Sequence, residues 1–175
     1  KKRAKNPWHR GIVFITGTDT GVGKTIFTAL LLAKMRRDGI RALAMKPFCS
    51  GSREDVRVLQ AVQANELPDE IANPFFFRAP LSPWSAAKIE WRKIVLADAL
   101  HAISAAKKHC DLLLVEGAGG LLSPLGEGFC ALDLIRKLRC PVVIVAPNRL
   151  GCIGQVMLVR SALLAAGAGL FRVAL

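Results

Sequence analysis

The sequence predicts an α/β fold of three layers, in which a mostly parallel central sheet is flanked by helices on both faces. Short apolar runs alternate with stretches of helical periodicity along the chain, which is typical of parallel strands covered on both sides. The chain has 175 residues, a length that suits one domain with a sizeable core. Hydrophobic residues make up 52% of it, which argues against a disordered chain.

The first strand and helix open the predicted order of elements. Residues 12–15 form an apolar run, and residues 25–35 suit a helix that is closed by Gly39. A second strand over residues 40–45 ends at Lys46-Pro47, where Pro47 fixes a turn. We expect a loop at residues 51–53 and a short helix at residues 55–62. Residues 65–83 are rich in Pro and Asn, so we expect them to be mostly irregular.

The second half of the chain continues the alternation. Residues 95–107 have helical periodicity, with Val95, Leu96, Ala99, Leu100 and Ile103 on one side. Strands are expected at residues 112–115, 141–145 and 170–175, and helices at residues 132–138 and 153–166. The chain thus divides into a basic N-terminal tail, residues 1–10, and a single domain, residues 11–175. Because an apolar strand stands at the chain end with no covering helix, we expect the domain to lack its C-terminal portion.

The net charge of +12 and the isoelectric point near 10.1 raise the question of a nucleic-acid partner. Five of the positive charges, however, precede the first strand (Lys1, Lys2, Arg3, Lys5 and Arg10). No aromatic residues alternate with the basic ones as a platform for stacking bases. We therefore interpret the charge as a solvated tail and an attraction for anionic substrates, with no nucleic-acid partner.

Neither a membrane span nor a disulfide framework is expected. The longest apolar segment, residues 153–171, contains Gln155, Arg160 and several glycines, so we expect no membrane partner. The five cysteines form no CxxC pair and no cluster with zinc spacing. This pattern favours reduced thiols and a cytoplasmic location.

The first apolar run leads into the glycine-rich stretch GTDTGVGKT, residues 17–25. A turn of this kind directs backbone N–H groups at phosphate, and the N-terminus of the following helix adds a partial positive charge. Lys24 is expected to reach the terminal phosphates, and the Thr25 hydroxyl to ligate Mg²⁺. The stretch predicts the fold of P-loop nucleoside triphosphatases, although the usual spacing would place glycine at position 18 and not at Gly17. The alternative is a purely structural strand–turn–helix. The expected nucleotide-binding residues here are Thr20, Gly21, Val22, Gly23, Lys24, Thr25 and Ile26.

Two further segments, Lys46–Ser50 and Glu116–Gly120, follow predicted strands and should meet the phosphate loop at the carboxyl edge of the sheet. Glu116 ends an apolar run, where P-loop enzymes place a carboxylate for Mg²⁺; the alternative is an ordinary strand-end carboxylate. Gly117, Ala118 and Gly119 would let the backbone approach a nucleotide closely. Lys46 lies at a strand end, but by spacing alone it could equally be a surface cation. Asp55 could simply cap a helix.

Five ordered blocks resemble the dethiobiotin synthetase family, which is an ATP-dependent carboxylase family of biotin biosynthesis. The blocks are GTDTGVGKT at 17–25, KPFCSG at 46–51, EDVRVLQ at 54–60, VEGAGGLLSPL at 115–125 and RLGCIG at 149–154. Asn73-Pro74 and Ser82-Pro83 fit the same pattern between them. The resemblance spans nearly the whole chain, and an ordered set of blocks is far more specific than any one of them.

The resemblance implies a ligase that converts 7,8-diaminononanoate, CO2 and ATP into dethiobiotin through a carbamate and a carbamic-phosphoric anhydride. It implies that Lys46 and Lys24 are catalytic, and that Mg²⁺ is held by Thr25, Asp55 and Glu116. Nucleotide binding is assigned to the phosphate loop together with Asp55 and the segment from Glu116 to Gly119. Substrate binding falls to Ser50 and to Gly151, Cys152 and Ile153, the latter three acting across a homodimer interface.

Three departures and three other interpretations stand beside this one. Gly154 and Leu81 replace an Asn and a Thr that are common in the family, and the family's segment that recognises adenine lies beyond position 175. A cobyrinic-acid amidation-type synthetase has similar loops but adds a glutaminase module. A ParA/MinD-like ATPase switch usually has a lysine where Asp19 stands. The remaining possibility is an inactive fragment.

Overall fold

The computed structural model, which describes residues 8–175, confirms the expected α/β architecture. Five parallel strands form the central sheet in the order β2-β5-β1-β8-β9. They are β1 (Gly11–Gly17), β2 (Ala42–Met45), β5 (Leu112–Glu116), β8 (Val142–Val145) and β9 (Phe171–Ala174). The lysines and arginine of the expected basic tail at positions 1, 2, 3 and 5 lie outside the described residues.

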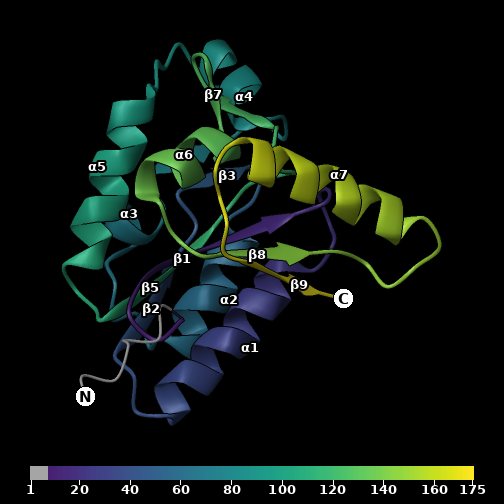
Figure 1. Ribbon diagram of the computed structural model, residues 1–175. Helices are drawn as coiled ribbons and strands as arrows, with labels where there is room; N and C mark the ends of the chain where they lie inside the picture. The colour runs from purple at the N-terminus through teal and green to yellow at the C-terminus, as the bar shows by residue number, and fades with distance from the viewer. Residues whose placement is uncertain (1–7) are drawn as a thin grey trace.

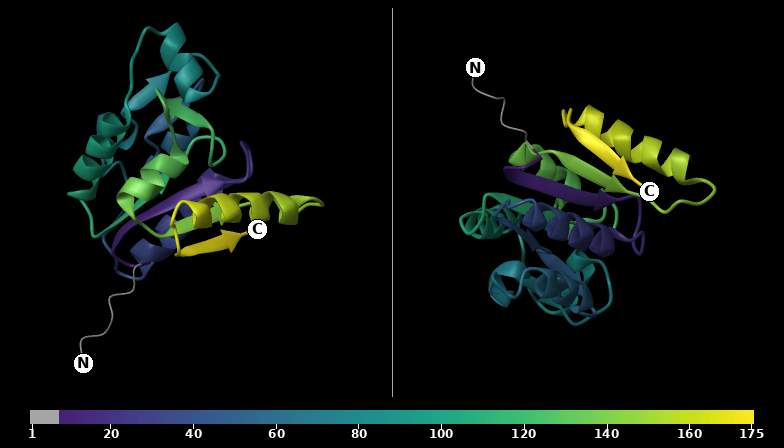
Figure 2. Two further views of the ribbon diagram at one scale, coloured as in Figure 1. Left: turned by 45° about the horizontal axis from the view of Figure 1, so that its top comes forward. Right: turned by 90° about the horizontal axis from the view of Figure 1, so that it is seen from below.

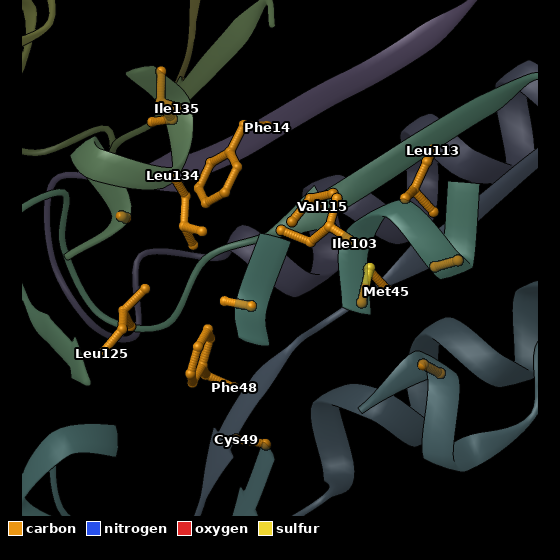
Figure 3. Close-up of a cluster of buried hydrophobic side chains, with 14 of the residues drawn as sticks. Phe14, Met45, Phe48, Cys49, Ile103, Leu113, Val115, Leu125, Leu134 and Ile135 are labelled. Atoms are coloured by element: carbon orange, nitrogen blue, oxygen red, sulfur yellow. The ribbon is translucent and has the colours of Figure 1, made fainter. Parts of the chain in front are cut away.

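Helices cover both faces of this sheet, as Figure 1 shows. Helices α1 (Lys24–Arg37) and α2 (Glu54–Val62) lie on one face, and α5 (Leu96–Lys107), α6 (Ala131–Leu138) and α7 (Cys152–Ala165) lie on the other. The alternation of side chains along β5 fixes the two layers. Leu112 and Leu114 pack in a cluster with residues of α1 and α2. Leu113 and Val115 pack with residues of α5, α6 and α7, in the cluster of Figure 3.

The segment 65–83 is mostly irregular, as expected, but it also contains two short regular elements that were not predicted. It holds α3 (Asp69–Ala72) and β4 (Phe75–Phe77), and α4 (Pro83–Ile89) begins at its end. β4 pairs in parallel with β3 (Phe48–Ser50), and the rings of Phe48 and Phe75 stack with their centroids 4.9 Å apart. The prediction weighted the prolines and asparagines, whereas the three consecutive phenylalanines decide the structure, because they bury apolar area against a strand distant in sequence. The hairpin of β6 (Pro124–Gly126) and β7 (Phe129–Cys130) was not predicted either.

The start of the described chain lies beside the edge strand β9, at one side of the molecule in Figure 2. Trp8 packs against the cluster on the α1 face, and the guanidinium of Arg172 in β9 lies 4.7 Å from the centre of its ring. Contact with the core therefore begins before β1. None of the helices within residues 8–175 is long and apolar enough to cross a membrane.

The strand register brings the predicted functional segments to one edge of the sheet. Ile15 pairs with Glu116 across β1 and β5, and Met45 pairs with Val115 across β2 and β5. Because all these strands are parallel, the phosphate loop, Lys46 and the segment after Glu116 leave the sheet at the same side. The expectation that the three segments meet is confirmed.

Candidate active site

The phosphate loop folds back on itself between β1 and α1, and Gly17 makes this possible. A Cβ at position 17 would lie 2.8 Å from a methyl group of Val22 and 3.1 Å from the Lys24 side chain. The glycine is therefore needed at position 17, one place before the usual position. Gly23 precedes α1 with φ of 93°, a conformation that glycine adopts without strain. The Lys24 ammonium donates to the carbonyl of Asp19 at 2.7 Å.

Side-chain alternation explains why a lysine and a carboxylate from different strands face the same helices. In β5 and β2, the even-numbered residues Leu112, Leu114, Ala42 and Ala44 belong to the cluster on the α1 and α2 face. Glu116 at the end of β5 and Lys46 directly after β2 continue this alternation. Both side chains consequently point toward the helices that carry Thr25 and Asp55.

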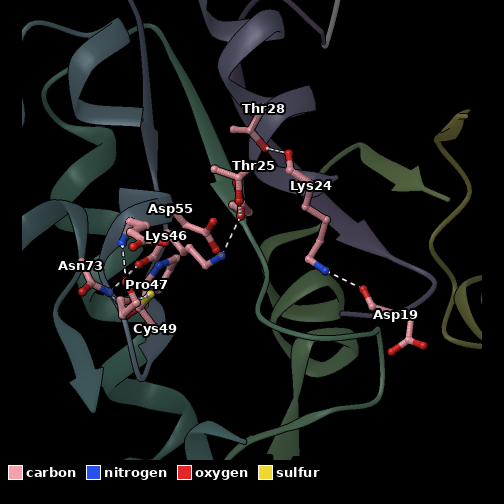
Figure 4. A network of polar contacts seen from close by, with 12 residues as sticks. Asp19, Lys24, Thr25, Thr28, Lys46, Pro47, Cys49, Asp55 and Asn73 are labelled. Atoms are coloured by element: carbon pink, nitrogen blue, oxygen red, sulfur yellow. Dashed lines mark hydrogen bonds and ion pairs between the residues drawn. The ribbon is translucent and has the colours of Figure 1, made fainter. Parts of the chain in front are cut away.

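These four side chains form one polar network, shown in Figure 4. The Thr25 hydroxyl donates to Glu116 Oε1 at 2.6 Å. The Lys46 ammonium donates to the same oxygen at 2.9 Å and also pairs with Asp55 Oδ2. Glu116 is fully buried and Lys46 is nearly so, whereas about half of the Asp55 side chain is exposed. One ammonium thus bridges two carboxylates whose residues are far apart in the sequence.

The network shifts the pKa values of its members in opposite directions. Burial disfavours the charged form of Lys46, but attraction to Glu116 and the hydrogen bond to Asp55 outweigh it, so the pKa of Lys46 is raised. Burial and then repulsion from Lys46 lower the pKa of Lys24. For Asp55, burial is outweighed by the hydrogen bond and attraction from Lys46, so the pKa of its carboxyl is lowered. Lys46 and Asp55 are therefore charged at neutral pH.

The donor set around Thr25 fits Mg²⁺. The second oxygen of Glu116, Oε2, is buried and has no hydrogen-bond partner within residues 8–175. A buried carboxylate oxygen in that condition is costly unless a donor or a cation satisfies it. No group of three His, Cys, Asp or Glu residues in the described chain is suited to hold a metal. Mg²⁺ does not need one, because it usually keeps several waters and binds one or two carboxylates together with substrate phosphates.

A cavity of about 740 Å³ opens onto this network. Most of the predicted nucleotide-binding residues line it, together with Lys46 and Ser50; they are Thr20, Gly21, Gly23, Lys24, Thr25, Ile26, Asp55, Ala118 and Gly119. Glu116 lies beneath the wall, bonded to the lining residues Thr25 and Lys46. Val22 packs against the core and does not line the cavity, nor does Gly117. Ser50 lines the cavity, and its hydroxyl is buried and without a hydrogen-bond partner among the described residues.

One predicted substrate segment lies elsewhere. Gly151, Cys152 and Ile153 form the start of α7 and do not line the cavity. Gly151 and Ile153 are exposed, and Cys152 is buried. Within a single chain, these residues are not part of the site around Lys46.

The structure adds wall residues that the sequence analysis did not assign to the site. The run from Pro80 to Pro83 lines the cavity, as do Phe48, Ser52, Val58 and Ser123. The run was missed because it stands in the segment expected to be irregular. The pairing of β3 with β4 carries it to the cavity, and a tertiary pairing of this kind leaves no local pattern in the sequence.

Comparison with known proteins assigns the family. The chain matches the family model described as an AAA domain over residues 12–175. It is 36% identical to the ATP-dependent dethiobiotin synthetase of Aromatoleum aromaticum over 162 residues. This aligned region covers 88% of this chain and 72% of that protein. The chain belongs to the dethiobiotin synthetase family. It is also 41% identical over 150 residues to the dethiobiotin synthetase of Bacillus licheniformis, which covers 83% of this chain and 64% of that relative's length.

A solved structure supports the fold alone. The kinase domain of the Escherichia coli tyrosine kinase ETK is similar, with a TM-score of 0.59 over 95% of this chain and 68% of that domain, but only 16% of aligned residues are identical. The likeness to this kinase domain therefore lies in the arrangement of sheet and helices.

Proposed function

We propose that the chain catalyses the ATP-dependent, ring-closing carboxylation of 7,8-diaminononanoate with CO2, which yields dethiobiotin. The observation that carries this proposal is the position of the Lys46 ammonium. It lies at the wall of one cavity that the phosphate loop also lines, and it is held there by Glu116 and Asp55. The family's curated relatives are named for this activity.

The phosphate loop would bind the triphosphate of ATP. Backbone N–H groups at the start of α1 and the ammonium of Lys24 meet the negative charge of the phosphates. Lys24 already lies over the loop through its bond to the Asp19 carbonyl. Thr25, Asp55 and Glu116 would hold Mg²⁺, which supplies charge neutralisation for the transferring phosphoryl group.

The substrate would react at the Ser50 and Lys46 end of the cavity. One amine of 7,8-diaminononanoate adds to CO2 and loses a proton, which forms a carbamate. A carbamate oxygen then takes the γ-phosphoryl group, and ADP leaves. Both reactants are anionic, so Lys46 and Lys24 lower the cost of bringing them together in a buried site. The Ser50 hydroxyl, which has no hydrogen-bond partner among the described residues, would hydrogen-bond the reacting end.

Ring closure needs orientation more than further acid or base groups. The second amine attacks the carbamate carbon, the bond from that carbon to the phosphate oxygen breaks, and phosphate and a proton leave. Holding an amine beside the activated carbon is worth up to about 7–11 kcal/mol in well-oriented systems. The wall from Pro80 to Pro83 lines the same cavity as the phosphate loop, so it would help to confine the substrate.

The carboxylate end of the substrate would be received by a second copy of the chain. Gly151, Cys152 and Ile153 lie outside the cavity of their own chain, and α7 exposes the apolar side chains of Ile153 and Leu158. A homodimer that covers α7 would bring this segment to the partner's cavity. A cytoplasmic location, expected from the cysteine pattern, belongs to the same proposal; all five cysteines are free thiols.

An assay of dethiobiotin formation tests the proposal directly. The purified chain should release phosphate and form dethiobiotin only when 7,8-diaminononanoate, bicarbonate and ATP are present together. Each nucleoside triphosphate should be tried in turn, which tests whether ATP is the preferred one. Phosphate release stimulated by DNA or lipid would instead favour an ATPase switch. The absence of any turnover with a correctly folded chain would favour an inactive copy.

A further inference from the structure

Asn73 is a buried amide whose side chain bonds to the backbone of Lys46. It follows α3 directly and is 2% exposed. Its amide nitrogen, Nδ2, donates to the carbonyl of Lys46 at 2.8 Å and to the carbonyl of Pro47 at 3.4 Å. These carbonyls stand 27 and 26 positions away in the sequence. Figure 4 shows the amide beside the turn that both residues form.

Main-chain bonds flank this contact on both sides. The N–H of Lys46 donates to the carbonyl of Ala72 at 3.0 Å, and the N–H of Phe75 donates to the carbonyl of Pro47 at 3.0 Å. Pro47 has no N–H of its own, so the chain after β2 cannot hold this turn through a regular ladder. The Lys46 carbonyl, which is buried in this turn, therefore accepts its hydrogen bond from the side-chain amide of Asn73.

The backbone at position 46 decides where the lysine ammonium lies. Four rotatable bonds separate the Lys46 backbone from its nitrogen, so a small rotation of the peptide displaces that nitrogen considerably. In the structure, the nitrogen donates to Glu116 at 2.9 Å and pairs with Asp55 as well. A fixed peptide and two carboxylate partners together define one position for the ammonium.

Local structure alone does not explain an asparagine here. The N–H of Asn73 donates to the Asp69 carbonyl at 2.9 Å, a bond that any non-proline residue could make at the end of α3. The side chain is buried, and its Oδ1 has no hydrogen-bond partner among residues 8–175. Burying a polar oxygen without a partner is unfavourable. The favourable contribution of Asn73 must therefore come from its NH2 group, which donates to the Lys46 and Pro47 carbonyls.

We propose that Asn73 is the positioning residue for the Lys46 ammonium. Its amide holds the Lys46–Pro47 turn and thereby sets the lysine nitrogen between Glu116 and Asp55, facing the cavity. Asn73 does not line the cavity itself and acts only through Lys46. The catalytic consequence of this role depends on the function proposed above, whereas the effect on the position of Lys46 does not.

Two substitutions test the role. Asn73→Ala removes the amide and fits the available space; Asn73→Asp keeps the shape of the side chain but, when ionised, loses both N–H donors. Each should lower kcat for dethiobiotin formation about 10–100-fold, since a displacement of about 1 Å at a reacting group has effects of that size. The KM for ATP should change less than about threefold, because the phosphate loop makes no hydrogen bond to Asn73.

A second measurement follows Lys46 without any turnover. Proton–nitrogen NMR spectra of the lysine side chains should show the Lys46 ammonium in the wild type, where its ion pairs slow proton exchange, and Lys46→Gln identifies the signal. In both Asn73 variants the signal should shift or disappear. Should Asn73→Ala fail to fold, Asn73→Asp carries both measurements, because its side chain has the same volume.

Gln60→Met is the matched control. Gln60 is likewise a buried amide, 4% exposed. It donates to the Leu67 carbonyl at 2.7 Å and to Asp69, and its Oε1 accepts from Gln63 at 2.6 Å, but it makes no hydrogen bond to the Lys46–Pro47 turn, and the bonds from Gln63 to Ala44 do not pass through it. It should lower the melting temperature while leaving kcat and the Lys46 signal unchanged. An Asn73 variant that behaves like this control would overturn the positioning role. If the wild type forms no dethiobiotin but the Lys46 signal still depends on Asn73, the proposed function fails and the positioning role stands.

Discussion

At the scale of single residues, the site depends on one ammonium shared by two carboxylates. Glu116 is fully buried, and a buried carboxylate is tolerable only when it is paired. Lys46 supplies that pairing and at the same time lines the cavity. The same charge therefore contributes to the stability of the fold and to the proposed phosphoryl transfer.

The substitution Lys46→Gln should separate these two contributions. We expect kcat to fall about 10²–10³-fold, as for the loss of one charge-stabilising donor, with only a modest loss of ATP affinity. The unpaired Glu116 should also lower the free energy of unfolding by about 3–5 kcal/mol. Kinetics and urea denaturation measure the two effects. Lys93→Gln, which removes an exposed partner of Glu127, is the control and should change neither. Unchanged turnover in Lys46→Gln would remove Lys46 from the proposed mechanism.

The lowered pKa of Lys24 predicts how ATP affinity depends on pH. Only the charged ammonium attracts phosphate, so affinity is complete below the pKa of Lys24 and is lost as the pH rises through it. Because burial and repulsion from Lys46 lower this pKa from 10.5, the loss should begin at a lower pH than for an ordinary lysine. Titrations with a fluorescent ATP analogue between about pH 7 and pH 10 would show it. In Lys46→Gln the loss should move to higher pH; an unchanged profile would contradict the proposed repulsion.

At the scale of elements, a buried glutamine makes the backbone hydrogen bonds that a neighbouring strand would otherwise make at the edge of the sheet. β2 is an edge strand of the central sheet, and Gln63 accepts from the Ala44 N–H at 2.8 Å and donates to the Ala44 carbonyl at 3.2 Å. Gln63 is fully buried at the end of α2. It thereby ties the helix that carries Asp55 to the strand that leads to Lys46.

Gln63→Met should consequently destabilise the protein by about 2–4 kcal/mol, because it leaves two buried backbone groups of Ala44 unpaired while keeping a side chain of similar length. Urea denaturation monitored by circular dichroism measures the loss. Gln155→Met in α7 is the control, since Gln155 is only half-buried, and it should cost less than about 0.5 kcal/mol. Equal stability of the two variants would show that the bonds to Ala44 contribute nothing.

The loop after β5 provides a matched pair of glycines. Gly119 has φ of +66°, and a Cβ there would lie 2.5 Å from the Ser123 hydroxyl. Gly128 has nearly the same φ, +70°, but nothing lies within 4 Å of its hypothetical Cβ. Both alanine variants pay for the left-handed backbone, about 1–2 kcal/mol. Gly119→Ala should lose more stability than Gly128→Ala, because its Cβ also collides with Ser123. It should in addition weaken ATP binding, because it distorts the cavity wall. Thermal melts measure the stability of the two variants, and titrations measure their ATP affinity. Equal losses would mean that Ser123 moves aside freely.

Elements with a strong local pattern could be predicted from the sequence, and elements made by distant pairing could not. The five strands of the central sheet and helices such as α1 and α5 were expected near their observed positions, because each is a continuous apolar run or has clear helical periodicity. The meeting of Lys46 with Glu116 followed from parallel strands ending at one edge. The pairing of Phe48 with Phe75 joins residues 27 positions apart, and no local sequence pattern predicts it. This pairing forms β3 and β4 and positions the wall from Pro80 to Pro83. The role of Asn73 could not be predicted for the same reason, because its side chain bonds to residues 26 and 27 positions away.

At the scale of the whole molecule, α7 presents an apolar surface that the described chain leaves uncovered. Ile153 is 77% exposed, Leu158 is 74% exposed, and Leu150 just before the helix is fully exposed. Single exposed apolar residues are ordinary, but several on one helix indicate a contact surface. The views in Figure 2 place this helix at the outside of the molecule, beside the edge strand β9.

The double variant Ile153→Asp/Leu158→Asp should therefore prevent self-association, because two carboxylates cannot be buried unpaired in an interface. Sedimentation velocity should show a dimer for the wild type and a monomer for the variant. The phosphate loop and Lys46 remain intact, so ATP should still bind, whereas dethiobiotin formation should be lost if Gly151 and its neighbours act on the partner's substrate. Ile89→Asp, on exposed apolar surface of α4, is the control and should remain dimeric and active. A monomeric variant with full activity would show that each chain completes its own substrate site, and the segment 151–153 would then have no part in it.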